Sequence, residues 1–262
     1  MVYTLGIDIG SSSSKAVILA DGKEIVSSAA VQVGTGTSGP GRVMEEVFKD
    51  TGLTAADIAY TVATGYGRFS VKEADKQISE ITCHAKGIFH LIPGARTIID
   101  IGGQDAKAIR LGENGNILQF YMNDKCAAGT GRFLDVMSRV LEIPLDKMGE
   151  AHFNATEWAS VSSTCTVFAE SEVISQLSNG VPRENIVAGV HKSVATKTCA
   201  LVRRCGELQQ EVVMCGGVAK NPGAVDAVEK ELGAKITVAP NPQITGALGA
   251  ALLAWEAYQK QQ

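Results

Sequence analysis

Two stretches of the chain, GIDIGSSSSKAVIL at residues 6–19 and IIDIGGQDAKAIRL at residues 98–111, follow one pattern. Each reads as an apolar strand, an acidic residue, a glycine turn, a polar segment and a second apolar strand, which is typical of a β-hairpin. Aligned without gaps, they share Ile7/Ile99, Asp8/Asp100, Ile9/Ile101, Gly10/Gly102, Lys15/Lys107, Ala16/Ala108 and Leu19/Leu111. A supersecondary unit that occurs twice predicts two similar halves.

The turns of both hairpins suit phosphate. Backbone N–H groups exposed at a glycine or serine turn form an anion-binding concavity, and hydroxyls add donors. Asp8 and Asp100 stand at strand ends, where we expect them to face each other across a cleft and hold a hydrated Mg²⁺. The plainer alternative is two ordinary hairpin turns that each carry an aspartate.

A third glycine-rich element, VVMCGGVAKNPG at residues 212–223, places Gly216 and Gly217 between an apolar strand and a predicted helix. A turn without side chains can lie against a flat adenine and ribose. The order of two phosphate loops and an adenosine loop is similar to that of the actin, Hsp70 and sugar-kinase ATPases, whose nucleotide lies between two ribonuclease H-like domains. The resemblance implies an α/β chain with one such domain at 1–94 and a second at 95–262, the C-terminal helix at 245–262 being able to pack back on the first.

Periodicity and turn residues predict the individual elements. We expect strands at 3–9, 14–20, 23–33, 60–64, 96–101, 106–112, 116–122, 159–162, 212–215 and 235–238. We expect helices at 41–50, 72–90, 127–142, 167–178, 184–205, 222–232 and 245–259.

The composition restricts the classes of partner. The chain has 262 residues, 45% of them hydrophobic, and a formal net charge of -4. This balance argues against binding to nucleic acid or to an anionic membrane, both of which need clustered Lys and Arg. No apolar run approaches the ~20 residues of a membrane span, and the N-terminal segment lacks the basic start of a signal peptide. We therefore expect a cytoplasmic protein.

Some motifs resemble sites of other kinds. Residues 34–39, GTGTSG, match a dinucleotide-binding GxGxxG, but Asp57, the acidic residue at a suitable distance, stands in an expected helix start rather than at a strand end. No GxxxxGK[ST] phosphate loop occurs. His84, His90, His152 and His191 lack metal-ligand spacing, so we expect surface or satisfied core residues.

The six cysteines include no CxxC pair, which disfavours a zinc ribbon. Cys126 and Cys165 each follow polar residues of the N-cap type and precede an amphipathic pattern, so we expect both thiols at helix N-termini, where the helix dipole stabilises a thiolate. Iron–sulfur clusters commonly take four cysteine ligands, and a two-fold homodimer would supply this pair twice. The alternative is two buried or free thiols near helix starts.

The segments NDKCAAGTGRFLDVM and SSTCTVFAESEVISQLS, together with LGIDIGSSSSK, VGTGTSGP, ATGYGR, DKQISEITCHA, TIIDIGGQDAK, VVMCGGVA and GALGAAL, resemble the activator components of 2-hydroxyacyl-CoA dehydratases. They are also similar to the ATPase subunits of benzoyl-CoA reductases, and the resemblance covers essentially the whole chain.

The resemblance implies a homodimer with one 4Fe-4S cluster at its interface, held by Cys126 and Cys165 of both subunits. Ferredoxin or flavodoxin would reduce the cluster. ATP hydrolysis would then drive one electron to an iron–sulfur 2-hydroxyacyl-CoA dehydratase, where it permits a radical dehydration. Cys83, Cys199, Cys205 and Cys215 fall outside the ligand motif and are expected to be structural.

Individual roles follow from the resemblance and from turn chemistry. Ser11, Ser12, Ser13, Ser14 and Lys15 are expected to contact the β- and γ-phosphates. Gly102, Gly103 and Gln104 are expected to line the second phosphate loop, with Gln104 and Asp105 as the candidate catalytic residues for hydrolysis and Gln104 orienting the attacking water. Asp8 and Asp100 would position Mg²⁺ or its waters. The expected adenosine contacts are Gly216, Gly217, Asn221 and Gln243.

Two other functions fit the same fold. A small-molecule kinase, of the pantothenate or acetylglucosamine type, would need no iron, but the chain offers no clear general-base aspartate beside an acceptor hydroxyl, with Asp105 as the one candidate. An actin-like assembly protein would form filaments with ATP.

Overall fold

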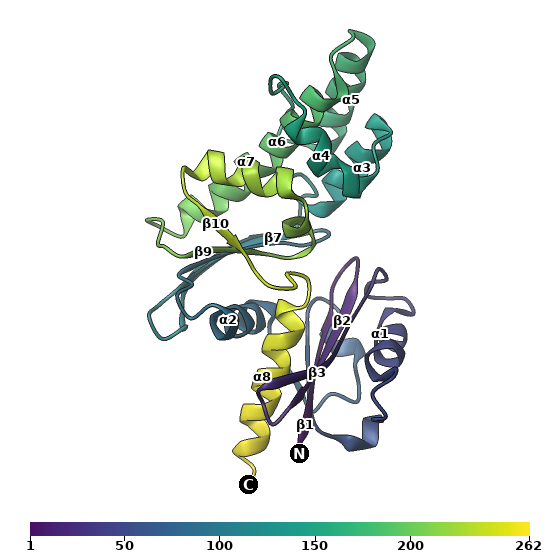
Figure 1. Cartoon of the computed structure of the whole chain (residues 1–262), viewed down its shortest axis with the longest axis vertical. Coiled ribbons are helices and arrows are strands. Elements are labelled where there is room, and N and C mark those ends of the chain that lie inside the picture. Colours follow the sequence, from purple (N-terminus) through teal and green to yellow (C-terminus); the bar gives the residue numbers. More distant parts are fainter. The chain divides into compact units, whose positions relative to one another are not determined.

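The computed structural model describes the whole chain, residues 1–262, as two compact units (Figure 1). Unit 1 comprises Met1–Ala95, Leu111–Ile117 and Ala239–Gln262, and unit 2 comprises Arg96–Arg110 and Leu118–Val238. Each unit is built on its own five-stranded sheet.

The sheet of unit 1 has the order β3-β2-β1-β4-β5. β1, β2 and β3 form an antiparallel meander, whereas β4 runs parallel to β1 and β5 runs parallel to β4. The elements of this unit are β1 (Tyr3–Ile9), β2 (Ser14–Ala20), β3 (Glu24–Val31), α1 (Gly39–Phe48), η1 (Ala55–Asp57), β4 (Ile58–Thr64), η2 (Arg68–Ser70), β5 (Lys76–Gln77), α2 (Glu80–Leu91) and α8 (Thr245–Gln259), where η denotes a 3₁₀ helix.

The first strand faces a different helix on each side. Its odd positions, Leu5, Ile7 and Ile9, pack in one apolar cluster with residues of α1. Its even positions face α8: the Thr4 hydroxyl donates to the carbonyl oxygen of Ala251 at 3.2 Å, and a side chain at Gly6 would collide with the backbone of α8. Because side chains alternate along a strand, Asp8 lies on the α8 side of the sheet. Figure 1 shows α1 and α8 on opposite sides of these strands.

The sheet of unit 2 has the order β10-β9-β6-β7-β8, with β6 and β7 antiparallel and β9 parallel to both β6 and β10. Its elements are β6 (Thr97–Ile101), β7 (Ala106–Leu111), β8 (Ile117–Asn123), α3 (Gly131–Leu141), η3 (Leu145–Lys147), α4 (Met148–Phe153), α5 (Thr166–Ser178), α6 (Arg183–Arg204), β9 (Val212–Cys215), η4 (Gly217–Lys220), α7 (Pro222–Leu232) and β10 (Ile236–Val238).

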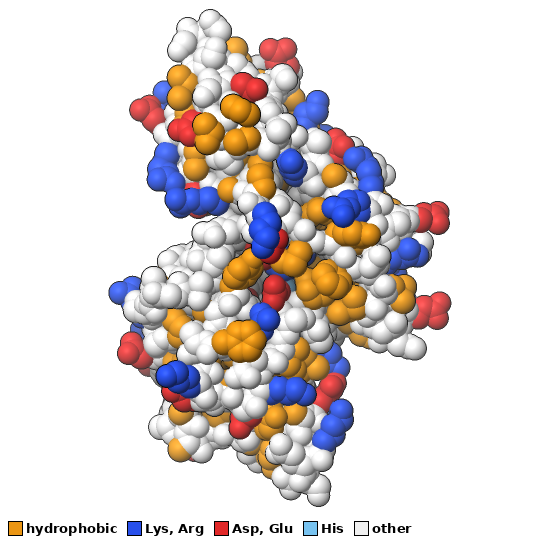
Figure 2. Space-filling model, turned by 180° about the vertical axis from the view of Figure 1, so that it is seen from behind, with side chains coloured by type: hydrophobic (Ala, Val, Ile, Leu, Met, Phe, Trp, Pro, Cys, Tyr) orange, Lys and Arg blue, Asp and Glu red, His pale blue; other side chains and the backbone are white.

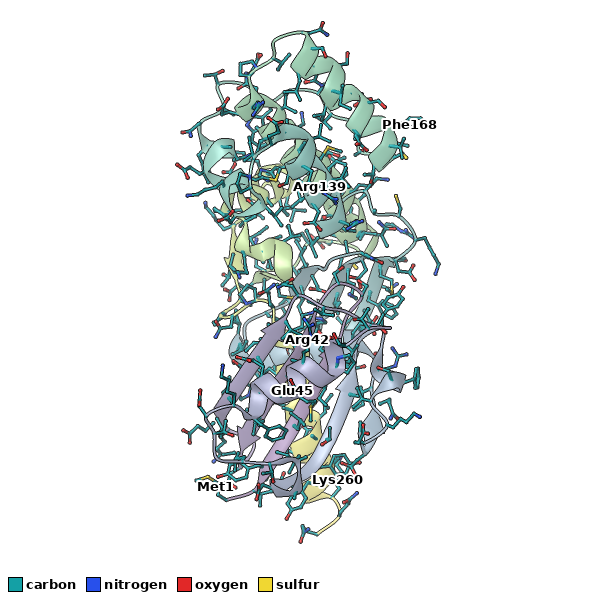
Figure 3. All side chains as sticks on the ribbon, turned by 90° about the vertical axis from the view of Figure 1, so that its right-hand side faces the viewer. Met1, Arg42, Glu45, Arg139, Phe168 and Lys260 are labelled. Atoms are coloured by element: carbon teal, nitrogen blue, oxygen red, sulfur yellow. The ribbon has the colours of Figure 1, made fainter.

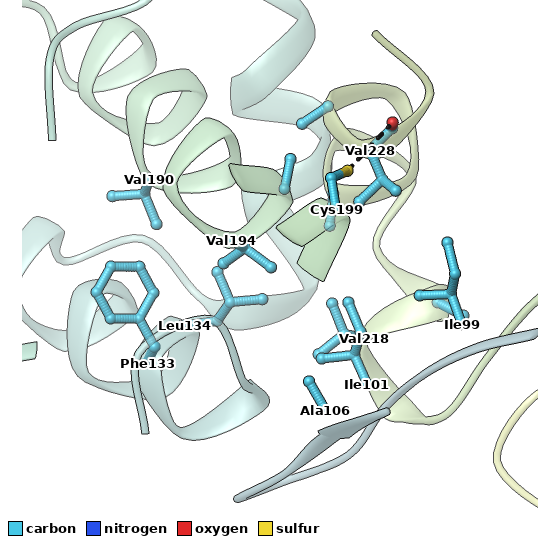
Figure 4. Packing of buried hydrophobic residues seen from close by; sticks show 14 of the residues in the cluster. Ile99, Ile101, Ala106, Phe133, Leu134, Val190, Val194, Cys199, Val218 and Val228 are labelled. Atoms are coloured by element: carbon cyan, nitrogen blue, oxygen red, sulfur yellow. Dashed lines mark hydrogen bonds between the residues drawn. The ribbon is translucent and has the colours of Figure 1, made fainter. Parts of the chain in front are cut away.

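One large apolar core holds unit 2 together. Ile99 and Ile101 of β6 belong to the same buried cluster as Val194 of α6 and Phe133 and Leu134 of α3, as Figure 4 shows from close by. Burial of a side chain of this size contributes about 1.5–3 kcal/mol. The helices that follow β8 are therefore fixed to the sheet by their own apolar faces.

Both predicted hairpins are confirmed, with Asp8 opposite Lys15 and Asp100 opposite Lys107 in register. The predicted strand at 159–162 is wrong, because the segment binds α6 instead of a sheet: the Ala159 N–H donates to the carbonyl oxygen of Asn185 at 3.0 Å. The predicted helix at 72–90 begins only at Glu80, since β5 precedes it and Ser79 caps it. The short helix α4 has no counterpart among the expected elements.

The exposed side chains carry both charges. Acidic and basic residues are interspersed over the face shown in Figure 2, with no continuous stripe of one sign. No helix in the structure combines the length and the apolar character that a membrane span requires.

Candidate functional site

The first of the two loops predicted to bind phosphate, called the first phosphate loop below, joins β1 to β2 in unit 1. The Gly10 N–H donates to the carbonyl oxygen of Ser13 at 3.0 Å, which closes the turn and leaves Ser12 exposed at its tip. Lys15 lies 3.4 Å from the Asp8 carboxylate, with 14% and 7% of the two side chains exposed. The hydroxyl of Ser14 is buried and donates to the carbonyl oxygen of Val33 at 2.8 Å. Among the residues expected to contact phosphate, Ser14 thus already uses its hydroxyl hydrogen in a bond within the protein.

The GTGTSG segment supports this loop. The Thr35 N–H donates to the carbonyl oxygen of Gly10 at 2.9 Å, and a side chain at Gly34 would collide with the backbone of Ser11 and Ser12. Asp57 is in the 3₁₀ helix η1 and binds the backbone and hydroxyl of Thr54, which lowers its pKa. The glycines of this segment therefore allow close backbone packing against the phosphate loop.

The second loop predicted to bind phosphate, called the second phosphate loop below, joins β6 to β7 in unit 2. The Gly102 N–H donates to the carbonyl oxygen of Asp105 at 2.9 Å, as in the first loop. The ammonium group of Lys107 is 3.1 Å from Asp100 and also pairs with Asp105. Burial opposes the charge of Lys107, but the two carboxylates outweigh it and raise its pKa. Lys107 is therefore a buried cation that pairs with two carboxylates, and only 3% of its side chain is exposed.

The second loop is also bound to a helix. The N–H groups of Gly131 and Arg132, the first residues of α3, donate to the carbonyl oxygens of Gly102 and Gly103 at 2.9 and 2.7 Å. These donors belong to the first turn, which has no partners within the helix. A displacement of the loop would therefore be transmitted to α3.

The loop predicted to contact the adenosine, called the adenosine loop below, follows β9. Gly216 has a φ of 83°, and Gly217 begins η4. A side chain at Gly216 would collide with the carbonyl oxygen of Ile101 and the carboxylate of Asp100. Gly65, at the end of β4 in unit 1, has a φ of 84° and the same relation to Ile9 and Asp8. Each phosphate hairpin thus has a left-handed glycine packed on the end of its first strand.

Asn221 and Gln243 are the two remaining residues expected to contact the adenosine. Asn221 is the N-cap of α7: its side-chain oxygen accepts from Gly223 and Ala224, and its amide lies 3.0 Å from Nε2 of His191. Gln243 precedes α8 in unit 1, whereas Gly216, Gly217 and Asn221 belong to unit 2.

Cys126 lies in a turn between β8 and α3. Its N–H donates to the Asn123 side-chain oxygen at 3.3 Å, and the Asn123 amide donates back to the Cys126 carbonyl oxygen at 2.9 Å. The prediction of a helix N-terminus at Cys126 is wrong, because Gly129 turns the chain with a φ of 84° and Thr130 caps α3 in an extended conformation. The thiol therefore sits on a short loop clamped by Asn123.

Cys165 is the N-cap residue of α5, so the prediction of a helix start is confirmed there. Its carbonyl oxygen accepts from the Ala169 N–H at 3.0 Å. Apolar side chains beside it are exposed, among them Val167 at 65% and Phe168 at 64%. Figure 3 shows Phe168 on the outer side of α5. The strand that leads to Cys126 also exposes Leu118 and Phe120.

The other four cysteines are buried. Burial raises the pKa of Cys83 and of Cys199 to about 12, and it raises the pKa of Cys205 as well. Cys199 lies in the core of unit 2 beside Val228 (Figure 4). A thiol with a raised pKa stays protonated, which makes it a poor metal ligand.

Two hairpins with glycine turns, a third glycine-rich loop after β9 and two mixed sheets define an actin-like, sugar-kinase-like ATPase fold with two α/β domains. A ROK-family glucokinase from Streptomyces griseus, solved with glucose and AMPPNP, has this fold with a TM-score of 0.61, 12% identity and coverage of 97% of this chain and 99% of its own. The predicted fold class is confirmed.

The chain belongs to the BadF/BadG/BcrA/BcrD ATPase family, whose sequence profile matches residues 5–254. It is 68% identical, over 99% of its length and 100% of the relative's, to the activator of lactoyl-CoA dehydratase from Anaerotignum propionicum. It is 54% identical to the (R)-2-hydroxyglutaryl-CoA dehydratase activating ATPase of Acidaminococcus fermentans, over 97% and 98% of the two chains. The activator of the 2-hydroxyisocaproyl-CoA dehydratase from Clostridium difficile, solved with bound ADPNP, superposes with a TM-score of 0.96, 54% identity and coverage of 100% and 97%. The resemblance to dehydratase activators is confirmed.

Three supporting contacts escaped the sequence reasoning: the packing of Gly34 and Thr35 on the first loop, the left-handed Gly65, and the bonds from α3 to the second loop. ATGYGR at residues 63–68 contained a usable signal, since its strand and glycine match those of VMCGGVA at 213–219. The bonds from Gly131 and Arg132 leave no sequence signal, because they use only backbone atoms.

Proposed function

We propose that this protein couples ATP hydrolysis to one-electron transfer from a 4Fe-4S cluster, shared by two copies of the chain, to an iron–sulfur 2-hydroxyacyl-CoA dehydratase. The observation that carries the proposal is the pair Cys126 and Cys165: in a chain similar throughout to dehydratase activators, these two of six cysteines are not buried.

The nucleotide is assigned to the three glycine-rich loops. In unit 1, the turn at Gly10–Ser13 and Lys15 would bind phosphate, with Asp8 holding Mg²⁺ through water. In unit 2, Asp100 would do the same for the second loop, and Gly216 and Gly217 would lie against the adenosine. Gln104 and Asp105, at the tip of the second loop, would orient the attacking water.

The residues present fit a cluster in their donor chemistry. Two accessible thiols per chain supply half of a four-thiolate set, and α5 directs its N-terminus toward Cys165, where the helix dipole favours a thiolate. When bound, the cluster supplies one-electron redox chemistry. The protein contributes the clamp at Asn123 and the helix start at Cys165, which hold the backbone of the two cysteines.

A second copy of the chain is the partner that the exposed apolar residues favour. Val167 and Phe168 flank Cys165, and Leu118 and Phe120 lie on the strand that leads to Cys126. A two-fold interface brings the same surface of both subunits together, so it would bury these side chains and join the two pairs of thiols.

Within unit 2, a series of contacts connects the second phosphate loop to Cys165. The second phosphate loop accepts hydrogen bonds from Gly131 and Arg132, and α3 packs against α5, whose N-cap is Cys165. Hydrolysis of ATP to ADP and phosphate would release contacts at Gln104 and shift both helices. The electron would come from ferredoxin or flavodoxin, in the cytoplasm, and leave to the dehydratase.

Oxygen-free purification tests the proposal. We expect a brown dimer with about four iron atoms per two chains. Cys126→Ser and Cys165→Ser should each lose the iron and retain ADP binding, whereas the control Cys199→Ala, in the buried core, should keep it. A wild-type protein that is dimeric and free of iron would refute the cluster. If that protein also transferred phosphate to a small molecule, it would be a kinase of the same fold.

A further inference from the structure

Four side chains of unit 2 form a hydrogen-bonded row that the proposed chemistry does not use. The Asn221 amide lies 3.0 Å from Nε2 of His191, Nδ1 of His191 lies 3.1 Å from Nδ1 of His152, and Nε2 of His152 lies 2.8 Å from the Asp226 carboxylate. The row joins α4, α6 and α7. His191 is fully buried, 3% of His152 is exposed, and Asp226 reaches solvent with 22% of its side chain.

The two ends of the row determine where its protons lie. The side-chain oxygen of Asn221 accepts from the backbone N–H groups of Gly223 and Ala224, so its NH₂ group must face His191 and donate. Nε2 of His191 is therefore unprotonated, and its Nδ1 carries the hydrogen that it donates to His152. At the other end, Asp226 accepts from Nε2–H of His152. Each ring carries one proton, and both rings are neutral.

No position in the row accepts a further proton. A hydrogen on Nε2 of His191 would face the Asn221 amide hydrogens, and a hydrogen on Nδ1 of His152 would face the Nδ1–H of His191. Burial and the neighbouring His152 lower the pKa of His191 to about 3, against the opposing effect of Asp226. The charged groups around the row are Asp226 and Lys230, which pair at 2.7 Å, and Lys220 and Glu229, which line a cavity together with Asp226.

The row ends at the exit of the adenosine loop. The Asn221 N–H donates to the carbonyl oxygen of Val218 at 2.9 Å, which closes the turn that starts at Gly216. Gly223 packs so closely that a side chain there would collide with both His152 and His191. The position of this loop exit therefore depends on the two rings and not on the cap of α7 alone.

We propose that Asn221, His191, His152 and Asp226 form a positioning relay, which holds the adenosine loop in its nucleotide-binding conformation through two neutral rings of fixed tautomer. The inference rests on the proposed use of this loop for adenosine. It gives Asn221 an indirect role, in place of a direct contact with the nucleotide.

Asn221→Asp is the discriminating variant. Aspartate caps a helix as well as asparagine does, so α7 keeps its N-cap. The second carboxylate oxygen, however, is an acceptor where the amide was a donor. A row with an acceptor at both ends can be satisfied only by three ring protons, so the variant must hold one proton more than the wild type.

Two measurements on the full-length protein test the relay. Nitrogen-15 NMR of the histidine rings should find Nε2 of His191 and Nδ1 of His152 unprotonated in the wild type, and one additional ring proton in Asn221→Asp. ADP affinity, measured by calorimetry from about pH 6 to about pH 9, should stay constant for the wild type. For Asn221→Asp it should fall about tenfold as the extra proton is lost on the alkaline side.

A second pair of variants controls for simple loss of packing. His191→Gln can accept from Asn221 and donate to His152, so it should keep ADP affinity within about threefold, whereas His191→Leu, which leaves both of these groups without a partner, should lose about tenfold. Equal pH profiles for wild type and Asn221→Asp, or the opposite tautomers, would overturn the relay. A wild type that binds no ADP would instead refute the proposed function. The number of histidine ring protons found by NMR would then still test the hydrogen bonds of the row.

Discussion

The two loops predicted to bind phosphate close with the same backbone turn but place their lysines in different surroundings. Both turns close with a hydrogen bond from the first glycine, and both have a left-handed glycine packed against the strand end. Lys15 has one carboxylate partner and stays partly exposed, whereas Lys107 has two and is buried. The second carboxylate comes from the last position of the turn, which is Ser13 in the first loop and Asp105 in the second.

The two loops are also held from outside by different elements. The first rests on the segment at Gly34 and Thr35, and the second on the first turn of α3. The two similar hairpins therefore differ both in the surroundings of their lysines and in the elements that support them. The first leaves its lysine partly exposed, whereas the second buries its lysine between two carboxylates and is hydrogen-bonded to α3.

The largest effect expected from this comparison is on stability. Lys107→Met removes the ammonium group that pairs with the buried Asp100 and the half-buried Asp105, so the free energy of unfolding should fall by roughly 3–5 kcal/mol. Lys15→Met should cost less than about 1.5 kcal/mol, because Asp8 loses a longer and partly solvated ion pair. Urea denaturation followed by circular dichroism measures both. Similar losses for the two variants would show that the lysines are equivalent after all.

An exchange of the distinguishing residue comes next. Asp105→Ser gives the second loop the residue of the first, and we expect the rate of ATP hydrolysis to fall about 100-fold if Asp105 helps to orient or deprotonate water. ADP affinity should change by less than about threefold, since the backbone of the turn remains. Phosphate release and calorimetry separate the two quantities. An unchanged rate would leave Gln104 as the remaining candidate in this loop.

The two units should also differ in acid tolerance, because His191 is buried in unit 2. Its pKa lies near 3 in the folded protein, below the ordinary value of 6.5, so the unfolded chain binds more protons between these limits. The contribution of His191 to the free energy of unfolding is therefore fully present above pH 6.5 and is lost as the pH falls, by about 2 kcal/mol between about pH 7 and about pH 5. In His191→Gln, the free energy of unfolding should fall by about 2 kcal/mol less over the same pH range. A pH dependence unaltered in this variant would assign acid lability to other groups.

The sequence allowed prediction of the parts of the site that depend on local pattern. Both hairpins, the glycine turns and the helix start at Cys165 follow from residue type and spacing, and they were found. The turn at Cys126 was not, because the prediction counted Ala127 and Ala128, which are good helix formers, as the helix start, whereas the left-handed Gly129 and the extended Thr130 delay the helix to Gly131.

The contacts that connect the site to its surroundings were beyond prediction for another reason. The histidine row joins residues from three helices, and the bonds from Gly131 and Arg132 involve no side chain. The lack of metal-ligand spacing led us to expect surface or satisfied core residues at His152 and His191, and both are buried core residues. The spacing contained no information about the contact between the two rings.

The smallest expected effect separates two serines within the first loop. Ser12 is exposed at the tip, so Ser12→Ala should leave stability unchanged and weaken ADP or ATP binding roughly tenfold, the loss of one hydrogen bond to a charged acceptor. Ser14 is buried and donates to Val33, so Ser14→Ala should lower the free energy of unfolding by about 1 kcal/mol and affect binding less. Denaturation and calorimetry on both variants give the four numbers. If Ser14→Ala had the larger effect on nucleotide affinity, the bond to Val33 would have to open when nucleotide binds, and the first loop would move as the second is expected to do.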